Sequence, residues 1–400
     1  MGCSNSSLAD DGAHGSASAG KAQAPTKPAV MAAAAGAPSD GEQAGEKGAA
    51  AASQGKREAI LQQMPSLSAK EVVEKMKECL LDHVVQQHGC AALSGAVAGG
   101  GWDPVVEAEG HVATIEAMKM HQQVSSVQEQ GCRVLQLLSA RPAQQAQVTA
   151  VGGMGAVIRA MQGHPREEGV QEQGCMALHN LVANHPNNKI KVASLRGIEA
   201  VLKAMDAHPA SESVIEHALW AIQVFVPNAS NQDKIAACSG ISRIIKSMRN
   251  HSKVVEIQWR GCWALGNLAY GHALNQGEIQ RKGGLEVLVQ VLSSHVDSPE
   301  VQQHAAHALK SSVANNKETQ ARVLELGGHQ VLLKGMSANL GHSGVQEQGC
   351  WALRNLAADS EQGTAALRLL GCGLVAKQAM EKHKDDPLVT KAAQEFLALL

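Results

Sequence analysis

The sequence is poor in aromatic residues, since Phe, Trp and Tyr make up only 2% of its 400 residues. Hydrophobic residues still account for 44% of the chain, so Ala, Val, Leu, Ile and Met must fill any buried core. Long apolar runs are also missing. No stretch of about 18 uncharged apolar residues occurs, so we expect no transmembrane helix. The N-terminus lacks an apolar segment, so we expect no secretory signal.

Several functional signatures are absent as well. Basic and acidic residues number 35 and 37, whereas a duplex-binding protein usually has a basic excess. The nine cysteines include no CxxC pair, which favours reduced thiols in a cytosolic protein. There is no phosphate-binding P-loop, G-x-S-x-G elbow or HExxH motif. We therefore expect no enzyme activity, cofactor, metal, nucleic-acid partner or small-molecule substrate.

The chain begins "MGCSNSS", which matches the N-myristoylation pattern with Gly2 as acceptor and Ser6 at the required position. A single myristoyl chain binds bilayers with an association constant of only about 10⁴ M⁻¹, so stable anchoring needs a second signal. Cys3, as a palmitoylation site, is the candidate for it. Residues 8–55 are rich in Ala, Gly, Ser and Pro, which predicts a flexible tether. We therefore predict that residues 1–55 are a disordered, acylated tether.

The sequence contains an internal repeat. The string "VQEQGC" occurs at Val127–Cys132, Val170–Cys175 and Val345–Cys350, and looser copies recur every 42–44 residues. The first residues of the aligned copies are Val85, Val127, Val170, Val214, Ile257, Val301, Val345 and Leu388. We call each of these first residues the anchor of its repeat. A second pattern, such as "GIEAVLKAM" from Gly197, begins 17 residues before the anchor, and its last copy slips by one residue near Cys372. Two patterns locked together indicate a repeat architecture.

Each repeat predicts three helices. The first is short and ends near a glycine such as Gly197, which fits a helix C′ position or a sharp turn. The second, Ile198–Met205, has apolar residues on one helical face. The third contains "VQEQGC". Prolines such as Pro165 and Pro299 fall between the second and third helices, where they break no helix.

The third-helix strings "GCWALRNLA" (Gly349–Ala357) and "GCWALGNLA" (Gly261–Ala269) resemble armadillo repeats, and the resemblance covers residues 57–400, about seven to eight repeats. It implies an all-α, right-handed α-solenoid with three helices in each repeat of about 43 residues. Together with the N-terminal pattern, the chain is similar to N-terminally acylated armadillo scaffold proteins of the fungal vacuolar and apicomplexan kinds.

The recurring cysteines and histidines have structural interpretations. Cys90, Cys132, Cys175, Cys262 and Cys350 share one repeat position, which Leu219 and Ala306 occupy elsewhere. A site that exchanges Cys for Ala or Leu is a small apolar packing site. The aligned histidines are His121, His164, His208, His251, His295 and His383. We interpret them as caps that donate to the last carbonyls of the second helix, because one His per repeat does not converge on a metal.

The resemblance also implies a concave groove lined by third helices, in which a Trp and an Asn four residues later hold an extended peptide. The matching and flanking positions are Arg133, Met176, Asn180, Trp220, Trp263, Asn267, His307, Trp351, Arg354 and Asn355. Only two repeats keep the complete Trp–Asn pair, so we predict a binding patch over repeats three to seven rather than a continuous ladder. Lys310 would add positive charge there. The alternative is that these Trp residues simply pack between repeats.

The leading hypothesis is a non-catalytic protein–protein interaction scaffold, cytoplasmic and held on the cytosolic face of a membrane by N-terminal acyl groups. Two alternatives stay open. One is a soluble peptide-binding adaptor of the transport-carrier type, which the incomplete ladder and the missing basic autoinhibitory arm count against. The other is an accessory subunit of a cytoskeletal or ciliary assembly.

Overall fold

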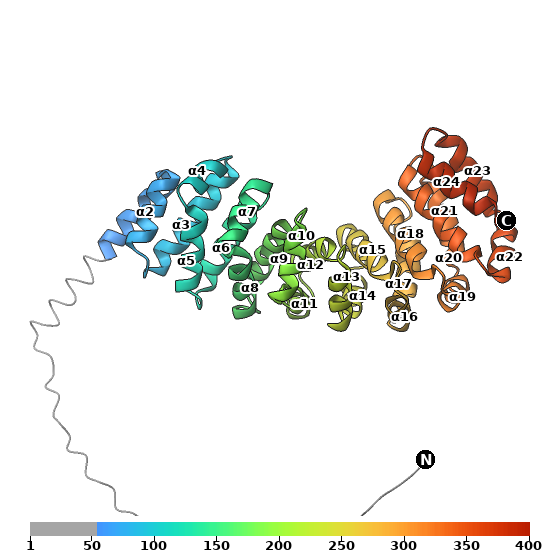
Figure 1. The fold of residues 1–400 in the computed structure, drawn as a ribbon, viewed down its shortest axis with the longest axis horizontal. Helices are drawn as coiled ribbons and strands as arrows, with labels where there is room; N and C mark the ends of the chain where they lie inside the picture. Colours follow the sequence, from blue (N-terminus) through green and yellow to red (C-terminus); the bar gives the residue numbers. More distant parts are fainter. Residues whose placement is uncertain (1–53) are drawn as a thin grey trace, which may run out of the picture. The chain divides into compact units, whose positions relative to one another are not determined.

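The computed structural model describes residues 54–400, and in this range the chain consists of helices joined by short connections, with no strand (Figure 1). Gly55–Leu400 forms one compact unit. The predicted lipidation sites, Gly2 and Cys3, lie outside the described residues.

The helices fall into three classes that recur in the same order. The first helices of the repeats are α4 (Trp102–Glu107), α7 (Pro142–Ala150), α10 (Pro186–Ser194), α13 (Ala229–Ala237), α16 (Ala273–Arg281), α19 (Lys317–Glu325) and α22 (Glu361–Leu369). The second helices are α2 (Ala69–Glu78), α5 (Gly110–Met120), α8 (Gly153–Gly163), α11 (Gly197–Ala207), α14 (Gly240–Asn250), α17 (Gly284–Ser294), α20 (Gly328–Ala338) and α23 (Cys372–Lys382). The third helices are α3 (His83–Ala98), α6 (Ser125–Leu138), α9 (Glu168–Val182), α12 (Glu212–Phe225), α15 (Val255–Ala269), α18 (Pro299–Val313), α21 (Ser343–Ala357) and α24 (Pro387–Leu397). Residues 54–63 are also helical and lead into the 3₁₀ helix η1 (Met64–Ser66), which precedes α2.

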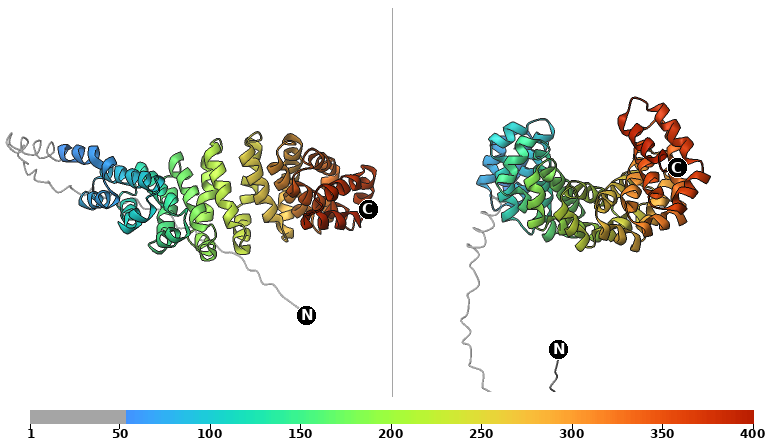
Figure 2. Two further views of the ribbon diagram at one scale, coloured as in Figure 1. Left: turned by 90° about the horizontal axis from the view of Figure 1, so that it is seen from above. Right: turned by 45° about the vertical axis from the view of Figure 1, so that its right-hand side comes forward.

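The repeats stack side by side. Neighbouring third helices pack more closely against one another than neighbouring second helices do. A row whose members lie closer together forms the inner side of a bend, and Figure 2 shows the array Gly55–Leu400 as a curved stack. The third helices therefore line its inner side.

Helix starts follow from local sequence. Ser68 caps α2 by a capping box: its hydroxyl accepts the N–H of Glu71, and the Glu71 carboxylate accepts the N–H of Ser68 at 2.8 Å. Pro299 and Pro387 are the first residues of α18 and α24, where the missing N–H costs nothing. These two prolines thus begin helices rather than break them, whereas Pro165 lies in the turn before α9.

The first Gln of "VQEQGC" is buried and joins two helices. In α9, Gln171 Nε2 donates to the carbonyl oxygens of Met161 and His164 at 2.9 and 2.8 Å. These carbonyls belong to the C-terminal end of α8, where intrahelical N–H donors run out. The same pair of bonds is formed by Gln86, Gln128, Gln258, Gln302 and Gln346. One side-chain amide therefore completes the end of the second helix and fixes it to the third.

The Gly–Cys pair that ends the string serves packing. A Cβ at Gly174 would lie 2.5 Å from Met161 Cγ, so glycine lets the second and third helices approach. The following cysteines, including Cys90 and Cys350, are buried. Burial raises the pKa of these two thiols to about 12. They therefore stay protonated and unreactive at neutral pH.

The aligned histidines join neighbouring repeats, which corrects the predicted capping of their own helix. The His164 backbone N–H bonds Ala160 of its own helix, whereas its ring Nε2 bonds the carbonyl of Gln122 in the preceding repeat at 2.8 Å. A carbonyl only accepts, so Nε2 carries the hydrogen. The other members of this set are His121, His208, His251, His295 and His383. The ring extends beyond the helix end, and the nearest free carbonyls lie in the adjacent repeat.

The turn between first and second helices also differs from the prediction. The left-handed residue is Arg196, with φ of 65°, and Gly197 is the first residue of α11. A Cβ at Gly197 would lie 2.4 Å from Val192 Cγ2 and 3.1 Å from the Val192 carbonyl oxygen. Glycine is thus needed for close contact with the first helix, while the residue before it adopts the positive φ.

The last repeat has a different register from the one that the sequence alignment gave. Its second helix begins at Cys372 after Gly371, which has φ of 72°. The residue 17 positions after Cys372 is Val389, which is fully buried, whereas Leu388 is 59% exposed. Val389 is therefore the anchor of the last third helix, and the one-residue slip disappears.

The close contact at the start of each second helix predicts the effect of adding one methyl group. In Gly240→Ala the new Cβ would lie 2.4 Å from Ile235 Cγ2 and 2.8 Å from the Ile235 carbonyl oxygen. We expect the free energy of unfolding to fall by about 1–3 kcal/mol, measured by urea denaturation. Gly277→Ala is the matched control, because nothing lies within 4 Å of its added Cβ in α16. A Gly240→Ala midpoint equal to or above that of the control would contradict this account.

Candidate partner-binding face

The third helices present one partly exposed face, which we call the third-helix face. It consists of the side chains two, three, six, nine and ten residues after the anchor of α6, α9, α12, α15, α18 and α21. In α15, whose anchor is Ile257, four of these are Trp259, Arg260, Trp263 and Asn267, all partly buried. The predicted groove residues all belong to this face.

The position six residues after the anchor varies most in chemistry. Arg133 is exposed on α6, and the partly buried residues that follow it are Met176, Trp220, Trp263, His307 and Trp351. Trp263 and Trp351 also pack against the hydrophobic core. Each indole thus has a packing role and a surface that solvent reaches.

The asparagines ten residues after the anchor are engaged within the protein. Asn180 Nδ2 donates to the carbonyl of Gln136 on the preceding third helix at 2.8 Å, and Asn355 Nδ2 to that of Lys310 at 3.0 Å. Asn267 Nδ2 instead donates to Trp263 of its own helix at 2.9 Å. One amide hydrogen of each Asn is used in this way, which leaves the second for a ligand.

Trp220 lies in a row of stacked side chains that crosses four third helices. The His179 ring lies 4.2 Å from the Trp220 ring, centroid to centroid. The Arg260 guanidinium carbon lies 4.9 Å from the Trp220 centroid and 4.3 Å from that of Trp259. Trp259 stacks on His304 at 5.3 Å. We call His179, Trp220, Arg260, Trp259 and His304 the stacked row.

Arg260 fills a gap in the helix packing. Helices α12 and α15 pack less closely than the other adjacent third helices, and the Arg260 side chain lies between their indoles. It forms an ion pair with Glu216 at 3.4 Å, with 11% of the side chain exposed. Its buried Nε has no hydrogen-bond partner among the described residues. Burial lowers the pKa of this guanidinium, and Glu216 opposes the shift. Cation–π contact with two rings helps to compensate the lost hydration.

The cationic and imidazole groups of α18 are held in a poorly hydrated setting. Burial lowers the pKa of His304 and His307 from 6.5 to about 4, so both rings are neutral at pH 7. Burial also lowers the pKa of Lys310, whose Nζ donates to Gln348 Oε1 at 2.6 Å. Arg354 donates to Asn355 Oδ1 at 3.3 Å, and its buried Nε has no hydrogen-bond partner in the described range. This half of the face therefore offers donors to a ligand.

Sequence comparison alone did not select four members of the stacked row: His179, Trp259, Arg260 and His304. The repeat positions of Trp259, Arg260 and His304 hold Gln or Glu in several other repeats, and the position of His179 changes from repeat to repeat, so no repeated motif marks them. The signal that was available is the unusual residue at the third position after the anchor, where Arg260 and His304 replace Gln.

Two further observations concern metal binding and membrane insertion. Among residues 54–400, no group of three or more His, Cys, Asp or Glu side chains is placed to hold a metal ion. No helix in the described range combines the length and the apolar character that crossing a bilayer requires.

The buried imidazoles predict a loss of stability in acid. Between pH 6.5 and about 4, the unfolded chain binds protons at His304 and His307 while the folded chain does not, so folding loses free energy as pH falls. We expect on the order of 2 kcal/mol for each histidine. His304→Gln/His307→Gln should lose less stability on acidification than the wild type, measured by urea denaturation at both ends of this range. His88→Gln, at an exposed position on α3, is the control, and equal losses in all three proteins would refute the assignment.

Comparisons with known proteins agree on the architecture. Residues 232–400 match the family model described as the LRRK2 ARM repeat. No curated protein matches the sequence significantly. An engineered protein is similar over 86% of this chain and 90% of its own, with 21% identity and a TM-score of 0.62. A chain from a study of a phosphorylation switch in the interaction between cadherin and beta-catenin is similar over 85% of this chain and 67% of its own, with 18% identity and a TM-score of 0.70. A designed armadillo repeat protein in complex with the peptide (KR)4 is similar over 62% of this chain and 98% of its own, with 21% identity and a TM-score of 0.54.

The all-α solenoid predicted from the repeats is thus confirmed, and so is the resemblance to armadillo repeats. In the part of the chain that the structure describes, the protein has the fold of an armadillo repeat array, and residues 232–400 match an armadillo repeat family model.

Proposed function

We propose that the protein is a non-catalytic scaffold that binds a protein partner on the third-helix face of repeats three to seven. The observation that carries this proposal is the stacked row with its neighbours on α18 and α21. Partly exposed aromatic rings lie beside cationic groups that burial has partly dehydrated. Such surfaces suit binding because Trp and Arg are enriched among the few residues that supply most of the free energy at protein interfaces.

The face favours a polypeptide over a small molecule. Its binding groups are spread over consecutive third helices rather than gathered around one cavity, and the free amide hydrogens of Asn180, Asn267 and Asn355 recur on every second third helix. An extended chain can contact such a row of donors through its backbone carbonyls. Trp263 and Trp351 lie on the same helices as two of these amides.

Removal of two indoles tests the proposed face. Trp263→Ala/Trp351→Ala should lose most captured partners in affinity purification of the full chain, because truncation of a central interface Trp typically costs about 2 kcal/mol or more. Leu274→Ala is the matched control, since this 79% exposed apolar residue lies on α16, away from the face. Melting curves by circular dichroism will check that both variants fold. An unchanged set of partners in the double variant would remove the assignment.

We further propose that Gly2 and Cys3 carry acyl groups that hold the scaffold on the cytosolic face of a membrane. The support is the N-terminal pattern and the Cys directly after the acceptor glycine. Two acyl chains suffice for stable anchoring where one does not.

Gly2→Ala tests the anchor, because it removes the acceptor for the first acyl chain. We expect the variant to move from the membrane pellet to the supernatant on fractionation, while Gly12→Ala stays in the pellet. Intact-mass measurement of the wild type should show the added myristoyl group. Equal pelleting of both variants would refute the acyl anchor, and an unmodified mass would favour the soluble peptide-binding adaptor.

A further inference from the structure

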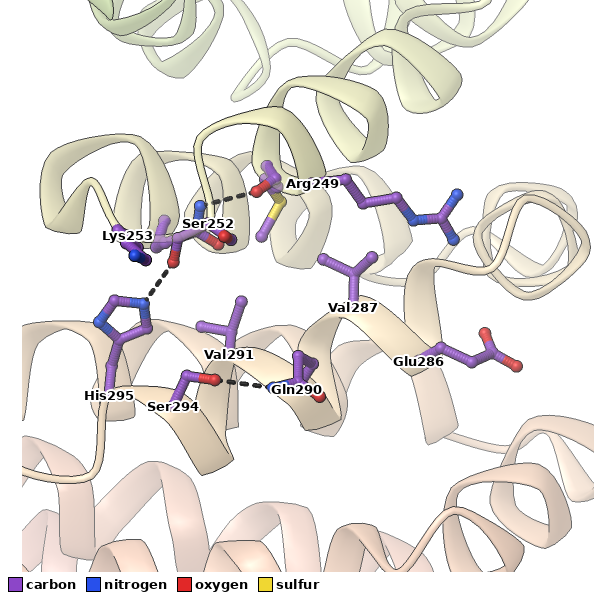
Figure 3. Close-up of a pocket in the computed structure, with 11 residues that line it drawn as sticks. Arg249, Ser252, Lys253, Glu286, Val287, Gln290, Val291, Ser294 and His295 are labelled. Carbon is purple, nitrogen blue, oxygen red and sulfur yellow. Dashed lines mark hydrogen bonds between the residues drawn. The ribbon is translucent and has the colours of Figure 1, made fainter.

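A pocket lies on the second-helix side of the array, between α14 and α17. It has a volume of about 780 Å³. Met248, Val287 and Val291 provide its apolar surface, and Figure 3 shows the two valines projecting from α17 toward α14. At one end, His295 Nε2 bonds the Ser252 carbonyl at 2.9 Å and ties the two repeats together.

The size of this pocket follows from the residues that face the preceding repeat. Val287 and Val291 occupy the fourth and eighth positions of α17, where α8 has Ala156 and Ala160. The corresponding pocket between α5 and α8 has a volume of only about 70 Å³. Helices α14 and α17 also pack less closely than α5 and α8 do. The two junctions therefore differ both in the side chains that line them and in the space that they enclose.

The rim of the pocket is positively charged. Arg249 and Lys253 lie on the α14 side, both exposed, and neither forms an ion pair with a carboxylate within residues 54–400. Arg249 is held in place because its Nη2 donates to the Gly283 carbonyl at 3.0 Å, which leaves its other nitrogens free. Glu286 is the acidic residue of the rim, and Arg322 already binds its Oε1 at 2.7 Å. The net charge offered to a ligand is therefore positive.

We propose that this pocket is a docking site for a peptide segment of a partner protein that carries an apolar side chain flanked by acidic residues. The apolar side chain enters between Met248, Val287 and Val291, and the carboxylates lie beside Arg249 and Lys253. The pocket volume falls in the range of about 300–1,000 Å³ typical of ligand sites. The exposed charges lie outside the cavity, where the flanking residues of a peptide would pass. The site lies on second helices and does not use the third-helix face, so the scaffold has two separate binding surfaces.

The test is fluorescence anisotropy with the full chain and a labelled peptide in which glutamates flank a central Leu-Phe pair. Two control peptides replace the glutamates by lysines or the Leu-Phe pair by Gly-Ser. We expect only the first peptide to bind measurably. Arg249→Glu/Lys253→Glu should weaken its binding about tenfold or more, as reversal of rim charges does at other interfaces. Ser294→Trp, at an exposed lining position, should block entry without disturbing the core.

Trp263→Ala/Trp351→Ala should bind this peptide as the wild type does, so failure of the third-helix face and failure of this site are distinguishable. Unchanged affinity in both the charge-reversed and the Ser294→Trp variants would overturn the proposal. Equal binding of the Gly-Ser peptide would also overturn it, because the pocket would then play no part. Binding of the anionic dye anilinonaphthalene sulfonate, blocked by Ser294→Trp, with no binding of the Leu-Phe peptide would replace it by a small-molecule site.

Discussion

The structure depends on one recurring interaction: a buried glutamine amide that completes the C-terminal end of a second helix. An α-helix end leaves its last carbonyls without donors, and burying them unpaired would cost several kcal/mol in each repeat. Gln171 and its equivalents supply two hydrogen bonds to those carbonyls from the adjacent third helix. The second and third helices can therefore meet at a buried corner. Where the position holds Ile215, the repeat lacks this bond and depends on apolar packing instead.

Once the carbonyls at the helix ends have hydrogen-bond partners, small residues set the distances between helices. Glycine at the start of α11 admits Val192 of the first helix, and Gly174 admits Met161 of the second. At the end of six second helices a histidine then ties its repeat to a carbonyl of the preceding one, and Asn339 does the same at the end of α20. These contacts recur along the chain, so stability is built from neighbouring pairs, as expected for a solenoid. The residues on the surface of each repeat can therefore differ from one repeat to the next.

That variation gives the two sides of the array different chemistry. On the third-helix face, Arg260 separates two indoles at the junction of α12 and α15, where helix packing is loosest. On the second-helix side, Val287 and Val291 line a pocket with a basic rim between α14 and α17. Both features lie in the middle of the array and arise from residues that depart from the repeat pattern.

The sequence by itself determined the repeat length, the three helices of each repeat and the assignment of the cysteines to packing, because periodic burial leaves a periodic pattern. It also placed the predicted face residues on one helical side. The roles of particular polar groups were decided only by tertiary structure. His164 could bond its own helix or a loop of the preceding repeat, Gly197 could serve a turn or a close contact, and the last anchor could be Leu388 or Val389. Each choice depends on which atoms a neighbouring repeat brings within a few ångströms, and the stacked row exists only because the packing of four third helices brings its side chains together.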